Sequence, residues 1–177
     1  MSWNKNTGES QEKLPKRLDI PTARKKLEKY CAYQERSQKQ VVEKCRDYGL
    51  NKEESEDLLI EMIQNNFINE QRFALAFARG KFKIKGWGKT KIKQGLLRQG
   101  VSNKLIQLAL DQISNESLKN TLHETAFKKL KILLKSEEMA ESIMNGESKI
   151  EYTQKVKLLR YLIAKGFSMD EVHQLPL

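Results

Sequence analysis

A glycine-centred pattern occurs three times along the chain and limits the folds that the chain can adopt. When Gly49, Gly100 and Gly166 are aligned, residues of the same kind stand at four other positions. Apolar residues stand eight and four positions before each glycine and one position after it, and a polar residue follows two positions after it. In that order the members are Val41, Ile92 and Leu158; Cys45, Leu96 and Leu162; Leu50, Val101 and Phe167; and Asn51, Ser102 and Ser168.

Each copy of the pattern predicts one helix, a tight stop and the start of a second helix. Apolar residues four positions apart lie on the same face of a helix. Glycine is the residue that most often ends a helix in the left-handed conformation. Asn and Ser are good N-caps for the helix that follows. Three copies therefore predict tandem helical repeats.

The chain is predicted to be all-α, with three tandem three-helix repeats in an elongated, curved helical array. No segment alternates polar and apolar residues as a strand would. We expect a disordered N-terminal arm over residues 1–21 and repeats over 22–67, 68–114 and 115–177, with a polar insertion at 136–149. Thr22 is the expected N-cap of the first helix. None of the units is expected to bury its apolar faces alone.

Composition places the chain among cytoplasmic proteins. No apolar run approaches the roughly 18–20 residues that a membrane span needs, and the first residues lack the apolar core of a signal peptide. The two cysteines, Cys31 and Cys45, lie in helical patterns and are expected to be small buried hydrophobic residues rather than a disulfide.

The net charge of the chain is concentrated in one segment. The chain has 33 basic and 23 acidic residues and a formal charge of +10. Residues 71–110 contain ten basic residues and no acidic one, so the rest of the chain is neutral. Such a local excess favours a polyanion or an acidic protein groove as the partner.

We therefore predict a basic binding surface in the second repeat. Its members are Arg72, Arg79, Lys81, Lys83, Lys85, Lys89, Lys91, Lys93 and Arg98. Trp87 stands between two glycines, and two roles are open for it. It packs the turn between helices, or it serves as a stacking platform or groove anchor. Packing is favoured, because most aromatic residues have core roles.

No catalytic, cofactor or metal site is expected. Gly88-Lys89-Thr90 has the form of the end of a P-loop, but Lys83 stands where that motif needs its first glycine, and no strand precedes it. His123 and His173 lie far apart and show no metal-ligand spacing with either cysteine.

Two stretches resemble the RecX family, bacterial regulators of the RecA recombinase. The first is the run from Phe73-Ala74 through Lys85-Gly86-Trp87-Gly88 to Gly100-Val101, and the second is residues 30–37. The resemblance covers about residues 22–175 and weakens after Leu130. It implies tandem three-helix repeats that lie in the groove of the RecA–DNA filament and limit its growth, ATP hydrolysis and strand exchange, without catalysis.

Two functions follow from these observations. The first is a monomeric regulator of the RecA filament that contacts acidic protein surface, single- or double-stranded DNA, or both. The second is a stand-alone helical DNA- or RNA-binding protein. Charge alone does not separate them, because phosphates and carboxylates attract the same side chains. The residues around Trp87 favour the first.

Overall fold

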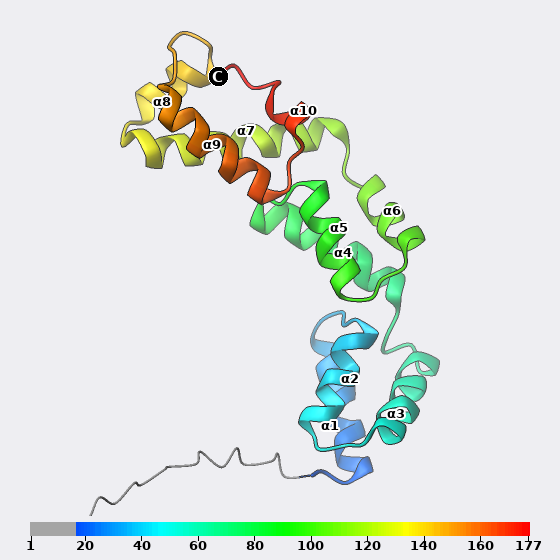
Figure 1. Ribbon diagram of the computed structural model, residues 1–177. Helices are drawn as coiled ribbons and strands as arrows, with labels where there is room; N and C mark the ends of the chain where they lie inside the picture. Colours follow the sequence, from blue (N-terminus) through cyan, green and yellow to red (C-terminus); the bar gives the residue numbers. More distant parts are fainter. Residues whose placement is uncertain (1–16) are drawn as a thin grey trace, which may run out of the picture.

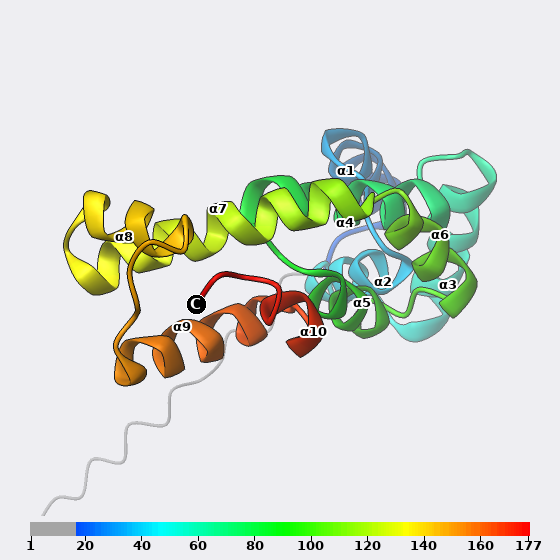
Figure 2. The ribbon, with the colours of Figure 1, turned by 90° about the horizontal axis from the view of Figure 1, so that it is seen from above.

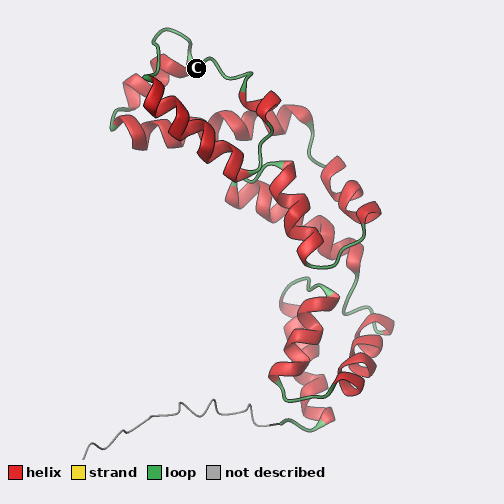
Figure 3. Ribbon diagram, in the orientation of Figure 1, coloured by secondary structure: helices red, strands yellow, loops and turns green. Residues whose placement is uncertain are grey.

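The structure is a computed structural model that describes residues 17–177, and all regular elements in that range are helices (Figure 3). Residues 1–16, most of the predicted N-terminal arm, lie outside the described residues. The ten helices within the range are α1 (Ile20–Tyr33), α2 (Gln38–Asp47), α3 (Lys52–Gln64), α4 (Glu70–Lys85), α5 (Lys89–Arg98), α6 (Asn103–Asp111), α7 (Asn115–Leu134), α8 (Glu137–Met144), α9 (Tyr152–Lys165) and α10 (Met169–Val172). In residues 17–177, no helix combines the length and the apolar character needed to cross a bilayer.

The helices are arranged as consecutive units along an elongated, curved array (Figures 1 and 2). We call α1–α3 unit 1, α4–α6 unit 2 and α7–α10 unit 3. Helix α8 falls in the segment that was predicted as a polar insertion, and it packs on α7 with Ala140 and Ile143 buried. The prediction of an all-α repeat fold is confirmed.

The glycine pattern produces the same turn in every unit. Gly49, Gly100 and Gly166 have φ of 76°, 80° and 92°. The residue after each glycine donates its backbone N–H to the carbonyl five positions earlier, at 3.2 Å. The donor–acceptor pairs are Leu50–Cys45, Val101–Leu96 and Phe167–Leu162, and all six residues are buried. This is the hydrogen bond of a Schellman stop, with its apolar contact.

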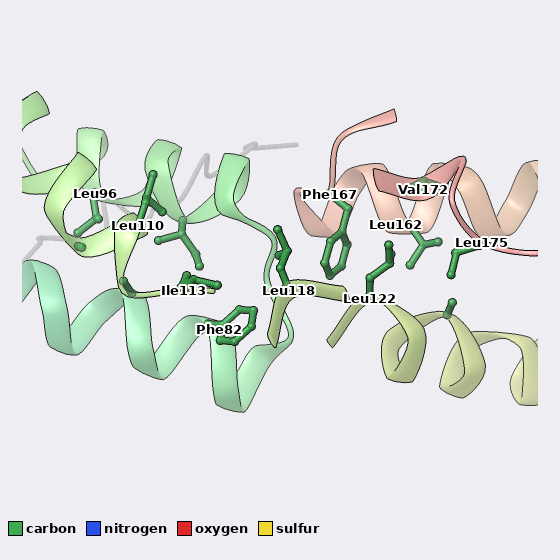
Figure 4. Close-up of a cluster of buried hydrophobic side chains, with 14 of the residues drawn as sticks. Phe82, Leu96, Leu110, Ile113, Leu118, Leu122, Leu162, Phe167, Val172 and Leu175 are labelled. Atoms are coloured by element: carbon green, nitrogen blue, oxygen red, sulfur yellow. The ribbon is translucent and has the colours of Figure 1, made fainter. Parts of the chain in front are cut away.

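Units 2 and 3 share one hydrophobic core, whereas unit 1 has a core of its own. Figure 4 shows the shared core, in which Phe82 and Ile113 of unit 2 line up with Leu118, Leu122 and Phe167 of unit 3. Unit 1 buries its own set: Ala23, Leu27, Cys31, Val41, Cys45, Leu50, Leu58, Met62 and Ile68. The expectation that no unit buries its apolar faces alone is therefore wrong for unit 1. Its three helices enclose enough apolar surface among themselves.

Helix α1 begins three residues earlier than expected, because its N-cap is Asp19 and not Thr22. The Asp19 carboxylate accepts the Thr22 backbone N–H at 3.2 Å. Hydrogen bonds from Thr22 lower the pKa of Asp19. Leu18 is also tied to the unit, since its N–H donates to the Tyr48 carbonyl at 2.9 Å. Residues 17–21, which the prediction placed in the arm, therefore belong to unit 1.

Candidate interaction surface

Helices α4 and α5 and the turn between them position the predicted basic surface. Asn69 caps α4 by accepting the Arg72 N–H at 2.9 Å. Gly86, with φ of 59°, ends the helix, and the Trp87 N–H donates to the Lys81 carbonyl at 3.1 Å. The buried side of α4 carries Phe73, Ala74, Ala78 and Phe82, and Arg79, Lys83 and Lys85 are exposed on the other side.

Arg72 is engaged inside the protein and connects unit 1 to unit 2. Its Nε lies 2.9 Å from Oε1 of Glu35, in the loop between α1 and α2 of unit 1. Its two terminal nitrogens donate to Oδ1 and the carbonyl of Asn66, at 2.7 and 2.9 Å. Asn66 has a positive φ of 58° in the linker between the units. The guanidinium therefore holds the joint, which leaves it less free than the other predicted residues to meet a partner.

Trp87 packs among residues of its own neighbourhood. Its ring meets Phe77 edge-on, with centroids 6.5 Å apart. The ammonium groups of Lys81 and Lys91 lie 5.1 and 4.9 Å from its centroid. Gly95 leaves room for this arrangement, because a Cβ there would lie 2.8 Å from the Phe77 ring. These contacts favour the packing role that the sequence suggested for Trp87.

Lys91 also joins units 2 and 3. Its Nζ donates to the Ala164 carbonyl at 2.7 Å, near the end of α9. A lysine at this place satisfies a helix-terminal carbonyl that has no partner within its own helix.

The other predicted residues point to solvent. Arg79, Lys83, Lys85, Lys93 and Arg98 are exposed, and Lys89 is half-buried at the start of α5. Of the ten basic residues in 71–110, Arg72 alone forms an ion pair within the described part of the chain. Outside the segment, four lysines pair with carboxylates: Lys44, Lys52, Lys128 and Lys131. The positive charge of the exposed cations is therefore not neutralised within the protein and can attract an anionic partner.

Two lysines of unit 3 also belong to this surface, although the prediction from the sequence did not include them. Lys128 of α7 and Lys165 of α9 line the same groove as Lys83 and Lys85. In the sequence they lie outside residues 71–110, so the acid-free segment does not include them. Only the packing of α7 and α9 against the end of α4 brings them together.

The surface offers ammonium and guanidinium donors and no assembled group of metal ligands. Within residues 17–177, no three His, Cys, Asp or Glu side chains gather in one place. Chemically, the arrangement suits electrostatic binding of phosphate or carboxylate groups.

Comparisons with known proteins agree on one family. Residues 69–110 match the model of the second three-helix domain of RecX. "Regulatory protein RecX" of Clostridium tetani is 28% identical over 137 residues, which cover 77% of this chain and 57% of that protein. The protein of the same name from Clostridium botulinum strain Eklund 17B is 29% identical over 135 residues, covering 76% and 58%. The chain thus spans less than three fifths of the length of these relatives.

Solved structures show the same fold. A crystal structure of regulatory protein RecX superposes with a TM-score of 0.71 at 21% identity, covering 88% of this chain and 70% of that one. RecX from Lactobacillus salivarius superposes with a TM-score of 0.66 at 20% identity, covering 87% and 92%.

Proposed function

Because the chain belongs to the RecX family, we propose that it is a negative regulator of the RecA recombinase. In this proposal it binds in the groove of the RecA–DNA filament and limits filament growth, ATP hydrolysis and strand exchange during recombination and DNA repair. It acts in the cytoplasm as a monomer and performs no catalysis of its own.

The match of residues 69–110 carries the proposal. That range contains Trp87 and all nine residues of the predicted basic surface. The part of the chain with the most specific family signal is therefore also the part that carries its net charge.

The shape of the molecule supports binding along a groove. The array is long and curved (Figure 1), and the exposed cations of the acid-free segment lie on the middle unit. A filament groove offers acidic protein surface and DNA phosphate, and both attract exposed Lys and Arg.

Co-sedimentation tests the proposal directly. RecA filaments are assembled on long single-stranded DNA with a non-hydrolysable ATP analogue and pelleted with this protein. We expect the protein to pellet with filaments and to stay in the supernatant with RecA that lacks DNA and nucleotide. If the protein remains in the supernatant in both cases, the filament proposal is wrong.

A stand-alone DNA- or RNA-binding protein is the second candidate. It is favoured by the five exposed cations that have no carboxylate partner in residues 17–177. The two candidates differ in their need for RecA. The second predicts equal binding to nucleic acid with and without RecA, and no effect on RecA activity.

A further inference from the structure

We propose that the groove between units 2 and 3 binds a phosphate of the nucleic-acid backbone. The inference deepens the proposed function, since it names the ligand of one part of the basic surface. It concerns a place that the sequence did not single out, and it does not depend on which protein accompanies the DNA.

Three helices build the groove, which has a volume of about 260 Å³. The end of α4 contributes Lys83 and Lys85. Helices α7 and α9 contribute Lys128 and Lys165, and hydroxyl groups also line the groove, from Thr121, Thr125 and Tyr161. Figures 1 and 2 show α7 and the end of α9 converging on the turn that follows α4.

The charge in the groove is unbalanced. Four ammonium groups line it, and among the described residues Glu124 is the one carboxylate that does so. Glu124 already lies 3.3 Å from Nζ of Lys128. Lysines that crowd together repel one another, and a bound anion relieves that repulsion. The groove is thus an anion site by its charge.

Part of the groove is held in place by contacts within the protein. Nζ of Lys165 donates to the Lys85 carbonyl at 2.9 Å, which ties α9 to the end of α4. Nζ of Lys165 also lies 5.5 Å from the ring centroid of Tyr161, and Nζ of Lys129 lies 5.1 Å from it. The donors therefore stand on a fixed framework formed by the shared core of units 2 and 3.

The donor set fits a phosphodiester better than a protein carboxylate. Lysine binds phosphate as a point charge with three N–H donors, and hydroxyl groups are common phosphate donors. Arginine, which grips a carboxylate with two parallel hydrogen bonds, does not line this groove. Lysines and hydroxyl groups with no arginine indicate contact with the backbone and not with base edges.

The groove continues along the surface, as a site for a polymer must. Lys83 also lines a neighbouring groove of about 320 Å³, together with Arg79 of α4. A row of cations therefore runs from Arg79 through Lys83 and Lys85 to Lys128. Successive phosphates of a nucleic-acid strand can contact successive cations in such a row, whereas a single anion would contact only one or two of them.

The test measures binding of the full chain to a fluorescein-labelled oligothymidylate of about 20 nucleotides. Fluorescence anisotropy reports the binding, and RecA is left out. The variant Lys83→Gln, Lys85→Gln, Lys128→Gln leaves Lys165 and its structural hydrogen bond intact. We expect roughly tenfold weaker binding, and a log–log salt slope that is shallower by about 2, since each contact to a single strand contributes about 0.7. The matched control is Lys25→Gln, Lys29→Gln, Lys119→Gln, which removes three exposed charges elsewhere and should change both values little.

Three results would overturn the inference: no binding of the oligonucleotide by the unmodified protein, equal losses in the two variants, or displacement of the oligonucleotide by polyglutamate at equal charge concentration. The last result would identify an acidic protein as the partner. Thermal melting of both variants checks the fold. The groove variant should melt close to the control, because the lost repulsion among the lysines offsets the loss of the exposed Lys128–Glu124 pair. Failure of RecA co-sedimentation with normal oligonucleotide binding would count against the filament proposal alone.

Discussion

Gly88 and Gly166 pack backbone against backbone where units 2 and 3 meet. The Gly88 N–H donates to the Lys165 carbonyl at 2.9 Å, and the Thr90 N–H donates to the Gly166 carbonyl at 3.2 Å. A Cβ on Gly88 would lie 2.2 Å from the Gly166 carbonyl oxygen, far inside van der Waals contact. The glycines therefore allow the helix ends to approach and the shared core to close.

The variant Gly88→Ala should open this junction. Because the obstacle is backbone and cannot rotate away, we expect a loss of about 2 kcal/mol or more in the free energy of unfolding by urea. Gly80→Ala is the matched control, since a Cβ there meets nothing within 4 Å. Gly80 lies inside α4, so the control should gain about 1 kcal/mol. Equal stability of the two variants would contradict the close packing at Gly88.

Gly100 tests the repeated helix stop by itself. A Cβ at Gly100 meets nothing within 4 Å, so its φ of 80° is the one obstacle to a side chain. Gly100→Val should lower the free energy of unfolding by roughly 1–2 kcal/mol, because a β-branched residue tolerates the left-handed conformation poorly. Gly100→Asn should cost less, since Asn visits that conformation more readily. If Val and Asn are equally tolerated in thermal melting, the stop does not require a left-handed residue.

Arg72 should hold unit 1 in its orientation. Within residues 17–177, three polar side-chain contacts join units 1 and 2: Arg72 with Glu35, Ser37 with Gln99 at 2.8 Å, and Lys39 with the Arg98 carbonyl at 3.1 Å. Loss of the guanidinium in Arg72→Ala leaves Glu35 unpaired and Asn66 unsupported. We expect faster hydrogen exchange over residues 65–69 and a changed radius of gyration in small-angle scattering. The stability loss should be only about 1 kcal/mol, because the pair is partly exposed.

The control for Arg72 is Arg24→Ala. It removes a similar ion pair, Arg24 with Glu61 at 2.8 Å, that lies wholly within unit 1. Hydrogen exchange at 65–69 and the radius of gyration should stay unchanged in this control. The same change in both variants would show that Arg72 has no particular role at the joint.

The thiols of unit 1 should make the protein less stable at high pH. Removal from water raises the pKa of Cys31 to about 11, and it raises the pKa of Cys45 as well. A raised pKa in the folded state favours the protonated thiol. This stabilisation is complete below the unfolded pKa of about 8.5, and it is lost as pH rises through about 11. The free energy of unfolding should therefore fall less steeply between about pH 8.5 and 10.5 in Cys31→Ala than in the unmodified protein. Parallel curves would contradict this.

The sequence predicted the parts of the fold that depend on local periodicity. Gly49, Gly100 and Gly166 marked the stops correctly because a left-handed turn has a strong residue preference. The sequence pattern did not predict that unit 1 has a separate core. Whether neighbouring units share a core depends on tertiary packing, which local periodicity does not report. The predicted limits of the repeats at 67/68 and 114/115 stay predictions.

The candidate surface was predictable only in part. The lack of acidic residues in 71–110 singled out the exposed cations of α4 and α5. It also included Arg72 and Lys91, whose internal hydrogen-bond partners in other elements are visible only in three dimensions. It omitted Lys128 and Lys165, which reach the groove through the packing of α7 and α9.

The exposed cations should carry filament binding. Replacement of Arg79, Lys83, Lys85, Lys93 and Arg98 by Gln removes five exposed charges. Each change should alter stability by less than about 0.5 kcal/mol. Co-sedimentation with RecA filaments should fall strongly and lose most of its salt dependence. The control replaces Lys25, Lys29, Lys52, Lys119 and Lys149, which are also exposed, and should pellet nearly as well as the unmodified protein. Equal loss from both sets would mean that net charge acts without a defined surface.

The most direct measurement is the rate of ATP hydrolysis by RecA on single-stranded DNA, with this protein added in increasing amounts. A regulator that limits filament growth acts on many RecA subunits at once, so we expect the rate to fall at substoichiometric protein. The variant in which the five exposed cations are replaced by Gln should inhibit hydrolysis much less than its control variant does. A RecA hydrolysis rate that stays unchanged in excess of the protein, with the cognate RecA, would contradict the proposed function.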